Sequence, residues 1–446
     1  MGTADNDFSK GSVVGNIVSL ALPMTLAQLI NVLYNIIDRV YIGRLGAEAT
    51  AALTGLGVCL PAVTIVIAFA NLVGMGGAPL FSIERGAGHN DEAERILGNS
   101  FAMIIVLSAV LTVLGFIFKV PLLRLLGASN ETLPFANSYL SVYLCGNLFV
   151  MVSLGLNSFI NAQGFGKTGM MTVIIGAALN IILDPLFIFT LHMGVQGAAL
   201  ATVISQLASA VWTFSFLTGK KAILKIKLDK MRCTAKRVRK ITTLGLAGFT
   251  MSITNSIVQM AYNMGLQNHG GDVYIGAMTI INSIREVIHM PIAGFSNGAQ
   301  PVIGFNYGAG RNDRVKSGIR WMSGILTVYT LLAWLLVSLF PRFFIGIFSS
   351  DPELMRVGVP SMHIYFFGFF MMALQSSGQS SFTALGKSKQ AIFFSIFRKV
   401  IIVTPLIFIL PHWFGVNGVF LSEPISNFIG GAACFITMLV TVYKKL

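Results

Sequence analysis

The chain has 446 residues, of which 54% are hydrophobic and 11% are charged, and its mean hydropathy is +0.76. This composition excludes an ordinary soluble protein, because the apolar residues occur in blocks long enough to span a bilayer. The net charge of +14 does not indicate nucleic-acid binding, since the Lys and Arg residues gather between the apolar blocks. The four cysteines have neither the spacing of a disulfide framework nor that of a zinc site.

The apolar blocks predict an all-α polytopic membrane protein with twelve transmembrane helices in two six-helix lobes. We expect a cytoplasmic N-terminus at residues 1–12, an N-terminal lobe at 13–218, a basic cytoplasmic linker at 219–240 and a C-terminal lobe at 241–446. The predicted spans are 13–42, 51–81, 96–118, 135–161, 169–190, 196–218, 241–265, 273–305, 320–340, 360–384, 391–410 and 417–442.

The basic linker sets the predicted orientation of the chain. Residues 220–240 contain ten Lys or Arg residues against one acid, Asp229, and loops rich in Lys and Arg stay on the cytoplasmic side of a membrane. Because an even number of spans lies on each side of the linker, both termini are then cytoplasmic. We expect the linker to contact anionic lipids rather than nucleic acid or another acidic partner.

The chain also repeats itself at a nearly fixed offset. Similar short sequences recur further along the chain in the same order, which indicates an internal duplication. Since each repeat has an even number of spans, the two halves point the same way, a plan common in secondary transporters. The matching pairs are Gly86–Asp91 with Gly308–Asp313, Gly166 and Lys167 with Gly386 and Lys387, Pro185 with Pro405, and Gly194–Gly197 with Gly415–Gly418.

The fifth predicted span contains the sequence GAALNIILDPLFIF, which is apolar except for Asn180 and Asp184. These two residues are four apart, so they share one face of a helix. Pro185 predicts a kink directly beside the carboxylate. An aspartate in the centre of a span costs about 2.5 to 3.5 kcal/mol. A partner, a proton or an ion must therefore compensate the charge of Asp184.

Asp38 and Thr202 are predicted to lie at the same depth as Asp184. Asp38 stands near the end of the first span and Thr202 near the start of the sixth, so both lie roughly 8 to 12 Å below the outer surface. Carboxylate, amide and hydroxyl oxygens suit Na+, and carboxylates also bind H+. We expect Asp38, Asn180, Asp184 and Thr202 to form a cation site that holds Na+ as its metal. The alternative is that they only hydrogen-bond to one another in the packed interior.

These motifs resemble the multidrug and toxic compound extrusion (MATE) transporter family. The resemblance covers essentially the whole chain and includes the first span with Pro23 and Asp38, the AQGFGK turn and the NIILDP sequence. It implies a V-shaped pair of lobes and cation-coupled export of amphipathic, often cationic compounds. It also implies that Tyr34 and Asn157 line the site in the N-terminal lobe. Because the seventh span lacks carboxylates, the chain is similar to the DinF-like and MepA-like bacterial branches.

The second half carries several ionisable residues inside its predicted spans. Such residues are candidates for function, and we expect those of the eighth span, together with Met290, to line the substrate cavity. The alternative is that the two acids only neutralise the basic groups within a network of the cavity wall. Because this half is net basic, neutral or zwitterionic substrates remain open. The ionisable residues are Arg285, Glu286, His289, Arg398, Lys399 and Glu423.

Together these features predict an alternating-access antiporter rather than an enzyme. Binding of Na+ or H+ would favour one arrangement of helices that hinge at Pro23 and Pro185. No ATPase motif is present, so we expect an ion gradient as the energy source and no cofactor besides the coupling ion. We expect a monomer in the inner membrane of a bacterium, with small amphipathic molecules and the bilayer as partners.

Two alternative functions stay open at this point. A lipid-linked precursor flippase should have a strongly basic cavity, whereas here the basic residues lie in one half only. A membrane-embedded transferase should carry a carboxylate cluster such as DDxxD, and the sequence has none.

Overall fold

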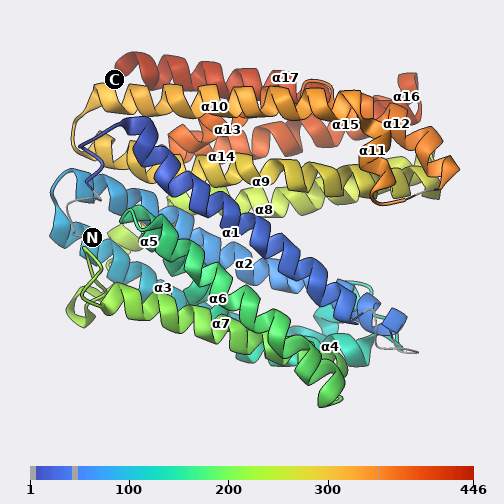
Figure 1. Ribbon diagram of the computed structural model, residues 1–446, viewed down its shortest axis with the longest axis horizontal. Coiled ribbons are helices and arrows are strands. Elements are labelled where there is room, and N and C mark those ends of the chain that lie inside the picture. Colours follow the sequence, from blue (N-terminus) through green and yellow to red (C-terminus); the bar gives the residue numbers. More distant parts are fainter. Residues whose placement is uncertain (1–6, 43–48, 350) are drawn as a thin grey trace. The chain divides into compact units, whose positions relative to one another are not determined.

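The structure is a computed structural model that describes residues 7–42, 49–349 and 351–446. Within these ranges every regular element is a helix (Figure 1), which confirms the predicted all-α class. The chain divides into two compact units, one built on Leu22–Gly245 and the other on Ser9–Ala21 and Leu246–Leu446. Half of the predicted cytoplasmic N-terminus, residues 1–6, lies outside the described ranges.

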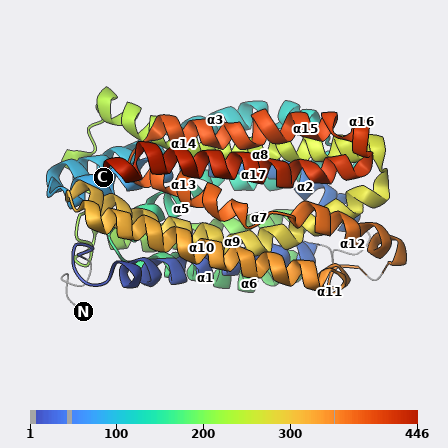
Figure 2. The same ribbon diagram turned by 90° about the horizontal axis from the view of Figure 1, so that it is seen from above.

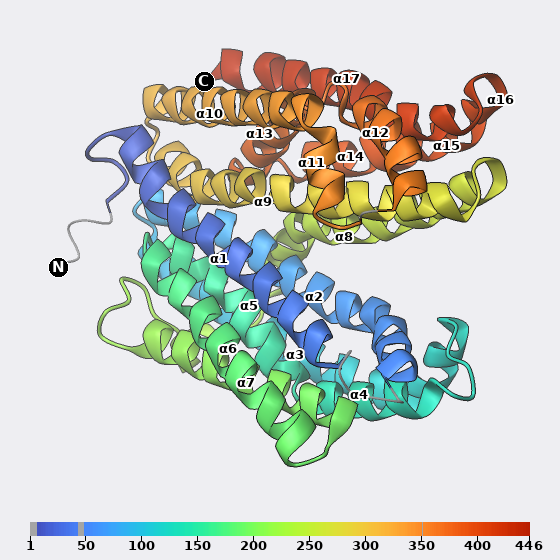
Figure 3. The ribbon, with the colours of Figure 1, turned by 45° about the vertical axis from the view of Figure 1, so that its right-hand side comes forward.

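The first unit contains most of α1 and the helices up to the linker. Helices α5, α6 and α7 contact one another and run side by side (Figure 3). Asp91 and Glu92 lie in the first turn of α3, where negative charge stabilises the helix dipole. The bounds are α1 Val13–Ile42, α2 Ala49–Gly86, α3 Asn90–Leu125, α4 Leu133–Cys145, α5 Asn147–Ala162, α6 Gly166–Pro185, the π-helix η3 Leu186–Thr190, α7 Gly194–Thr218 and the 3-10 helix η4 Leu228–Lys230.

In the second unit α9 contacts α10, α12 and α13, and α9 and α10 run side by side (Figure 2). Asp351 begins α12, since its Oδ1 accepts a 2.8 Å hydrogen bond from Glu353 N. The bounds are α8 Ala235–His269, α9 Asp272–Gly308, α10 Asn312–Leu339, α11 Pro341–Gly346, α12 Pro352–Phe366, α13 Met371–Ala384, α14 Ser388–Ile396, the π-helix η5 Phe397–Val403, α15 Thr404–Ile409, α16 Pro411–Phe414, α17 Val416–Thr441 and the 3-10 helix η6 Tyr443–Lys445.

The described helices agree with a polytopic membrane protein. Nine of them are long and apolar enough to cross a membrane, or up to eleven segments if each of two bent pairs is one span. The bent pairs are α4 with α5 at 58° and α12 with α13 at 49°, and they correspond to the predicted spans 135–161 and 360–384. The predicted span 273–305 corresponds to α9, which has 37 residues and carries Arg285 and Glu286 near its middle.

The turn between α2 and α3 recurs between α9 and α10. Gly88 has a φ of +79° and its N–H donates to Arg85 O at 3.1 Å; Gly310 has a φ of +68° and donates to Tyr307 O at 3.1 Å. Both turns need a glycine, because other residues rarely adopt a positive φ. The two glycines hold the same place in the repeated sequences Gly86–Asp91 and Gly308–Asp313, which supports the internal duplication.

A second repeated turn corrects one of the predicted matches. Gly164 has a φ of +92° and donates to Asn161 O at 2.9 Å, while Gly386 has a φ of +68° and donates to Thr383 O at 3.1 Å. Gly164 precedes Gly386 by the same offset as Gly88 precedes Gly310. The match of Gly386 with Gly166 was therefore wrong, because the residue that must adopt the positive φ is Gly164.

The beginning of α8 packs closely against α2 within the first unit. A Cβ atom at Gly76 would collide with the carbonyl oxygen of Ile241, and one at Gly245 would collide with that of Leu72. Small residues of this kind let two helix backbones approach each other in a membrane protein. The end of the linker is therefore anchored on the first unit.

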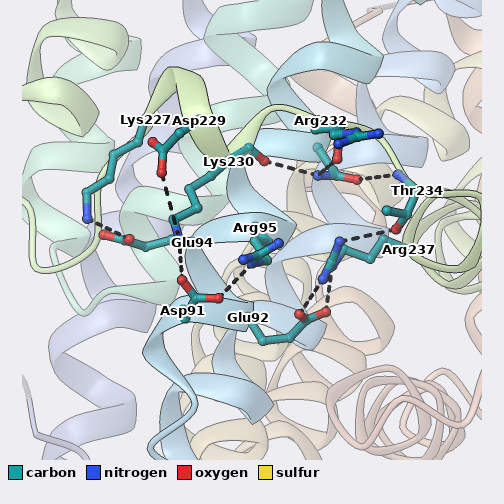
Figure 4. Close-up of polar contacts among 11 residues, drawn as sticks. Asp91, Glu92, Glu94, Arg95, Lys227, Asp229, Lys230, Arg232, Thr234 and Arg237 are labelled. Atoms are coloured by element: carbon teal, nitrogen blue, oxygen red, sulfur yellow. Dashed lines mark hydrogen bonds and ion pairs between the residues drawn. The ribbon is translucent and has the colours of Figure 1, made fainter.

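Ion pairs fix the basic linker to the start of α3 (Figure 4). Three acidic side chains of α3 bind three basic side chains that lie in the linker. The hydrogen bond from Lys227 to Glu94 raises the pKa of this lysine. The pairs are Lys227 with Glu94 at 2.7 Å, Arg237 with Glu92 at 2.7 Å and Lys230 with Asp91.

The buried side chain of Asn99 holds the backbone of the linker. Its Nδ2 donates to the carbonyl oxygens of Lys230 and Arg232, both at 3.2 Å, and its Oδ1 accepts from Thr234 N at 3.3 Å. One amide thus satisfies three backbone groups of the linker. That the linker also contacts anionic lipid stays a prediction.

We expect Asn99→Ala to make the linker about tenfold more sensitive to trypsin, because each lost hydrogen bond is worth about 0.5–1.5 kcal/mol. The measurement is the rate at which limited proteolysis splits the chain within residues 219–240. Ser100→Ala is the matched control, because its buried Oγ has no hydrogen-bond partner among the described residues. Equal cleavage of Asn99→Ala and wild type would contradict this role for Asn99.

Candidate functional site

Helix α6 carries the two polar residues that the sequence singled out. Asn180 and Asp184 lie one turn apart on it and are buried, with exposed fractions of 2% and 0%. The α-helix ends at Pro185 and continues as a π-helix over Leu186–Thr190. A proline has no N–H to donate, and π-helical turns often occur at functional sites. The helix geometry therefore changes directly after the carboxylate.

Asn180 connects Asp184 to α7. Its Nδ2 donates to Asp184 Oδ1 at 3.3 Å and to Thr202 Oγ1 at 3.4 Å, and Thr202 Oγ1 donates to Ala198 O at 3.0 Å. Because a carboxylate only accepts hydrogen bonds, the amide must turn its NH2 toward Asp184. The first two bonds are long, so they hold the side chains together only weakly.

Two buried oxygens of this group have no donor. Asn180 Oδ1 and Asp184 Oδ2 accept no hydrogen bond from an N–H or O–H group of the described residues. An unsatisfied buried acceptor is costly, and in a native protein it points to a bound water, proton or ion. These two oxygens are available to a cation that approaches α6.

The carboxyl group of Asp38, on α1, lies within hydrogen-bonding reach of Asp184. Two carboxylates this close repel each other strongly when both are charged and away from water. A hydrogen bond can join them only when one of the two carries a proton, and a cation between them would also remove the repulsion. The structure thus brings together all four predicted cation-site residues, Asp38, Asn180, Asp184 and Thr202.

A pair of tyrosines that the sequence analysis missed lies beside Asp38. Tyr139 and Tyr143 on α4 are buried and stacked, with ring centroids 6.1 Å apart. Tyr139 lies within the range over which the charge of Asp38 acts on it. Tyr34 is four residues before Asp38 and therefore on the same face of α1. The only sign of this pair in the sequence is the spacing of four residues between two tyrosines of one apolar helix.

Asn157, on α5, contacts α6 far from the carboxylates. Its Nδ2 donates to Gly169 O at 3.2 Å and its Oδ1 accepts from Thr172 Oγ1 at 3.2 Å. Thr172 is twelve residues before Asp184, which on an α-helix is about 18 Å. Within the described ranges no hydrogen bond links Asn157 to the four cation-site residues, so its role as a lining residue stays a prediction.

The residues predicted to line a cavity in the second unit differ in burial. Met290 is buried, with an exposed fraction of 7%, whereas Glu286 is exposed and forms no salt bridge with a described residue. Arg285 and His289 lie one turn apart on α9, and both interact electrostatically with charged groups of neighbouring helices. These four residues therefore do not all face one surface.

The described residues contain no group of three or more His, Cys, Asp or Glu side chains that could hold a metal ion. A site with two carboxylates, an amide and a hydroxyl is of a different kind, since its oxygens suit an alkali cation or a proton.

The chain is similar to known transporters over most of its length. The MatE family model matches residues 23–186 and 248–409. The multidrug export protein MepA of Staphylococcus haemolyticus is 26% identical over 428 residues, which cover 94% of this chain and 92% of that protein. The MepA protein of a Staphylococcus aureus strain is 25% identical over 436 residues, which cover 98% and 95%.

A solved structure has the same fold. It is described as the outward-facing conformation of a multidrug resistance MATE family transporter of the MOP superfamily. The TM-score is 0.92 at 23% sequence identity, and the match covers 99% of both chains. At this level of identity the likeness establishes the fold alone.

We expect the purified protein to become more stable against heat when Na+ is added at a fixed alkaline pH. Lowering the pH in the absence of Na+ should have the same effect. A cation at a hundred times its dissociation constant adds about 2.7 kcal/mol to the free energy of unfolding. Asp184→Asn should lose this stabilisation, because the variant removes the buried charge that the cation compensates. Thermal unfolding in detergent measures the effect.

Glu131→Gln is the control for this experiment, because Glu131 is an exposed acid outside the site. The cation site would be contradicted if Asp184→Asn responded to Na+ and to pH in the same way as wild type.

Proposed function

Since the chain belongs to the MATE (MatE) family of transporters, we propose that it exports amphipathic compounds across a membrane in exchange for Na+ or H+. The observation that carries the proposal is the adjacent pair of carboxyls, Asp38 and Asp184, with the donorless oxygens of Asp184 and Asn180 beside them. The names of its relatives, multidrug export proteins, support small organic molecules as substrates.

The coupling ion binds at the carboxyl pair, where two like charges would otherwise face each other. A proton or Na+ removes the repulsion between Asp38 and Asp184, and Na+ in addition gains the oxygens of Asn180 and Thr202. An ion shifts a conformational equilibrium only as far as its affinities for the two states differ. The site meets this condition because its parts come from α1, α6 and α7, so a relative shift of these helices changes the distances between the ligand oxygens.

Pro23 and Pro185 are the proposed hinges. Pro185 lies directly between Asp184 and the π-helical turn of α6, so the ion and the irregular backbone are adjacent. Pro23 lies inside α1, two residues after Ala21, where α1 passes from one compact unit to the other. Helices bend most readily at such prolines.

The proposed setting is the cytoplasmic membrane of a bacterium, with both termini and the linker on the cytoplasmic side. The basic linker supports this orientation, because Lys and Arg residues are retained there. The relatives that match over the whole chain come from bacteria. We propose that a single chain is the transporting unit, since one chain contains both compact units.

We expect proteoliposomes that contain the wild type to extrude a cationic dye when a Na+ or a proton gradient is imposed. Asp184→Asn and Asp38→Asn should each reduce this transport at least about a hundredfold, because a coupling charge is lost. Imposing the Na+ gradient at constant pH, and then the pH gradient without Na+, identifies the coupling ion.

Glu131→Gln serves as the control, and it should transport at the wild-type rate. If neither gradient moved any dye through the wild type, antiport would be excluded and a lipid-linked precursor flippase would become the better explanation. If both Asp variants kept normal, gradient-dependent transport, the cation site would be misplaced.

A further inference from the structure

A second polar cluster lies in the second unit, mainly on the helices that the internal duplication relates to α6 and α7. We call it the second-unit basic cluster. Its members lie on α9, η5 and α17, and they come together although these elements are far apart in sequence. The members are Arg285, Arg398, Lys399, Glu423 and Asn427.

The single carboxylate of this cluster is paired with an arginine. Arg398 Nη1 donates to Glu423 Oε1 at 2.9 Å and to Asn427 Oδ1 at 2.6 Å. The other oxygen, Glu423 Oε2, accepts a 3.1 Å hydrogen bond from Tyr262 OH. Arg398, Glu423, Asn427 and Tyr262 are all buried. Glu423 therefore compensates the charge of Arg398, and its one negative charge cannot also neutralise a second basic group.

The remaining basic groups have no carboxylate of their own. Lys399 donates a hydrogen bond to the neutral side chain of Asn255, and Arg285 forms no salt bridge with a described residue. An arginine does not lose its proton inside a protein. Even if Lys399 were neutral, two guanidinium groups would share the one carboxylate of Glu423. Arg285 and Lys399 are half-buried inside the membrane-spanning part of the second unit, where positive charge without a counter-ion is unfavourable.

The unsatisfied atoms of the cluster are hydrogen-bond donors. Arg285 Nε and Asn427 Nδ2 are buried, and neither donates to a described residue. Because Arg398 can only donate, Asn427 must turn its oxygen toward Arg398, which leaves the NH2 unpaired. In the first unit the unpaired atoms are acceptors, Asp184 Oδ2 and Asn180 Oδ1. The two units therefore need ligands of opposite charge.

The neighbours of the cluster do not supply the missing negative charge. Glu286, the next residue on α9, is exposed and forms no salt bridge with a described residue. His289 lies near Arg285, Arg398 and Lys399, and as a histidine it cannot add negative charge. Tyr365, which also lies near Arg285, is a neutral phenol at ordinary pH.

We propose that the second-unit basic cluster binds the anionic group, a carboxylate or a phosphate, of an amphipathic molecule. Arginine suits this role because its planar fork binds carboxylate and phosphate oxygens in pairs. The molecule is the exported compound or a lipid of the bilayer, since both offer an anionic head on an apolar body. This inference rests on the proposed export function and extends its substrates to zwitterions and anions.

The test uses one rhodamine fluorophore in two forms, a cationic methyl ester and the same dye with its carboxylate free. In proteoliposomes of phosphatidylcholine alone, we expect Arg285→Gln to raise the KM for the free-carboxylate dye at least about tenfold, because a charged hydrogen bond is lost. The KM for the methyl ester should stay within about twofold of wild type. Transport of the ester also shows that the variant is folded.

Two further variants sharpen the result. Arg285→Lys keeps the charge but loses the paired donors, so its KM for the free-carboxylate dye should lie between those of Arg285→Gln and wild type. Arg356→Gln is the matched control, because Arg356 is an exposed arginine of the same unit that pairs with Glu353 at 2.6 Å. It should leave both KM values unchanged.

A second arm distinguishes the two sources of the anion. Phosphatidylglycerol is added to purified wild type and Arg285→Gln in detergent, and thermal unfolding is measured. Suppose that phosphatidylglycerol stabilises only the wild type, and that Arg285→Gln has the same effect on the KM values of both dyes. This result would assign the anionic group to a lipid. If Arg285→Gln changed neither the dye KM nor the lipid effect, the proposal would be overturned. Wild type that moved neither dye would instead overturn the export function.

Discussion

The position of one carboxylate, that of Asp184, is the constraint on which the first unit depends. The side chain is fully buried in an apolar helix, with a second carboxyl, Asp38, beside it and one oxygen without a donor among the described residues. Such an arrangement is stable only with a proton or a cation bound. A membrane transporter can use this requirement, since binding of the ion and the packing of α1, α6 and α7 are then coupled through the same few atoms.

The chain contains two polar clusters, one in each unit. They differ in the kind of atom that has no hydrogen-bond partner: acceptors in the first cluster and donors in the second. Within the described ranges, the first unit has unpaired oxygens near Asp184, and the second has unpaired nitrogens at Arg285 and Asn427. The scaffold is preserved, as the matching turns at Gly88 and Gly310 show. The two units therefore share backbone turns where glycine is required, while their buried polar side chains differ.

Part of the candidate site was predictable from sequence because it depends on helix geometry. Asn180 and Asp184 are four residues apart, so any helix places them on one face, and an aspartate inside an apolar span is conspicuous because it is costly. The role of Tyr139 was not predictable, since a tyrosine in a membrane helix has several ordinary explanations. Only the packing of α4 within the first unit brings Tyr139 into the electrostatic range of Asp38.

The sequence alone determined the class of the protein, its helices, its duplication and its family, because hydropathy, periodicity and repeats are local properties of the chain. The tertiary structure decided which polar atoms have partners. It showed that Glu423 accepts hydrogen bonds from Arg398 and Tyr262, that Arg285 Nε has no acceptor among the described residues, and that Asn99 holds the linker. Such facts depend on side chains from helices far apart in sequence, and no local pattern records how these helices pack.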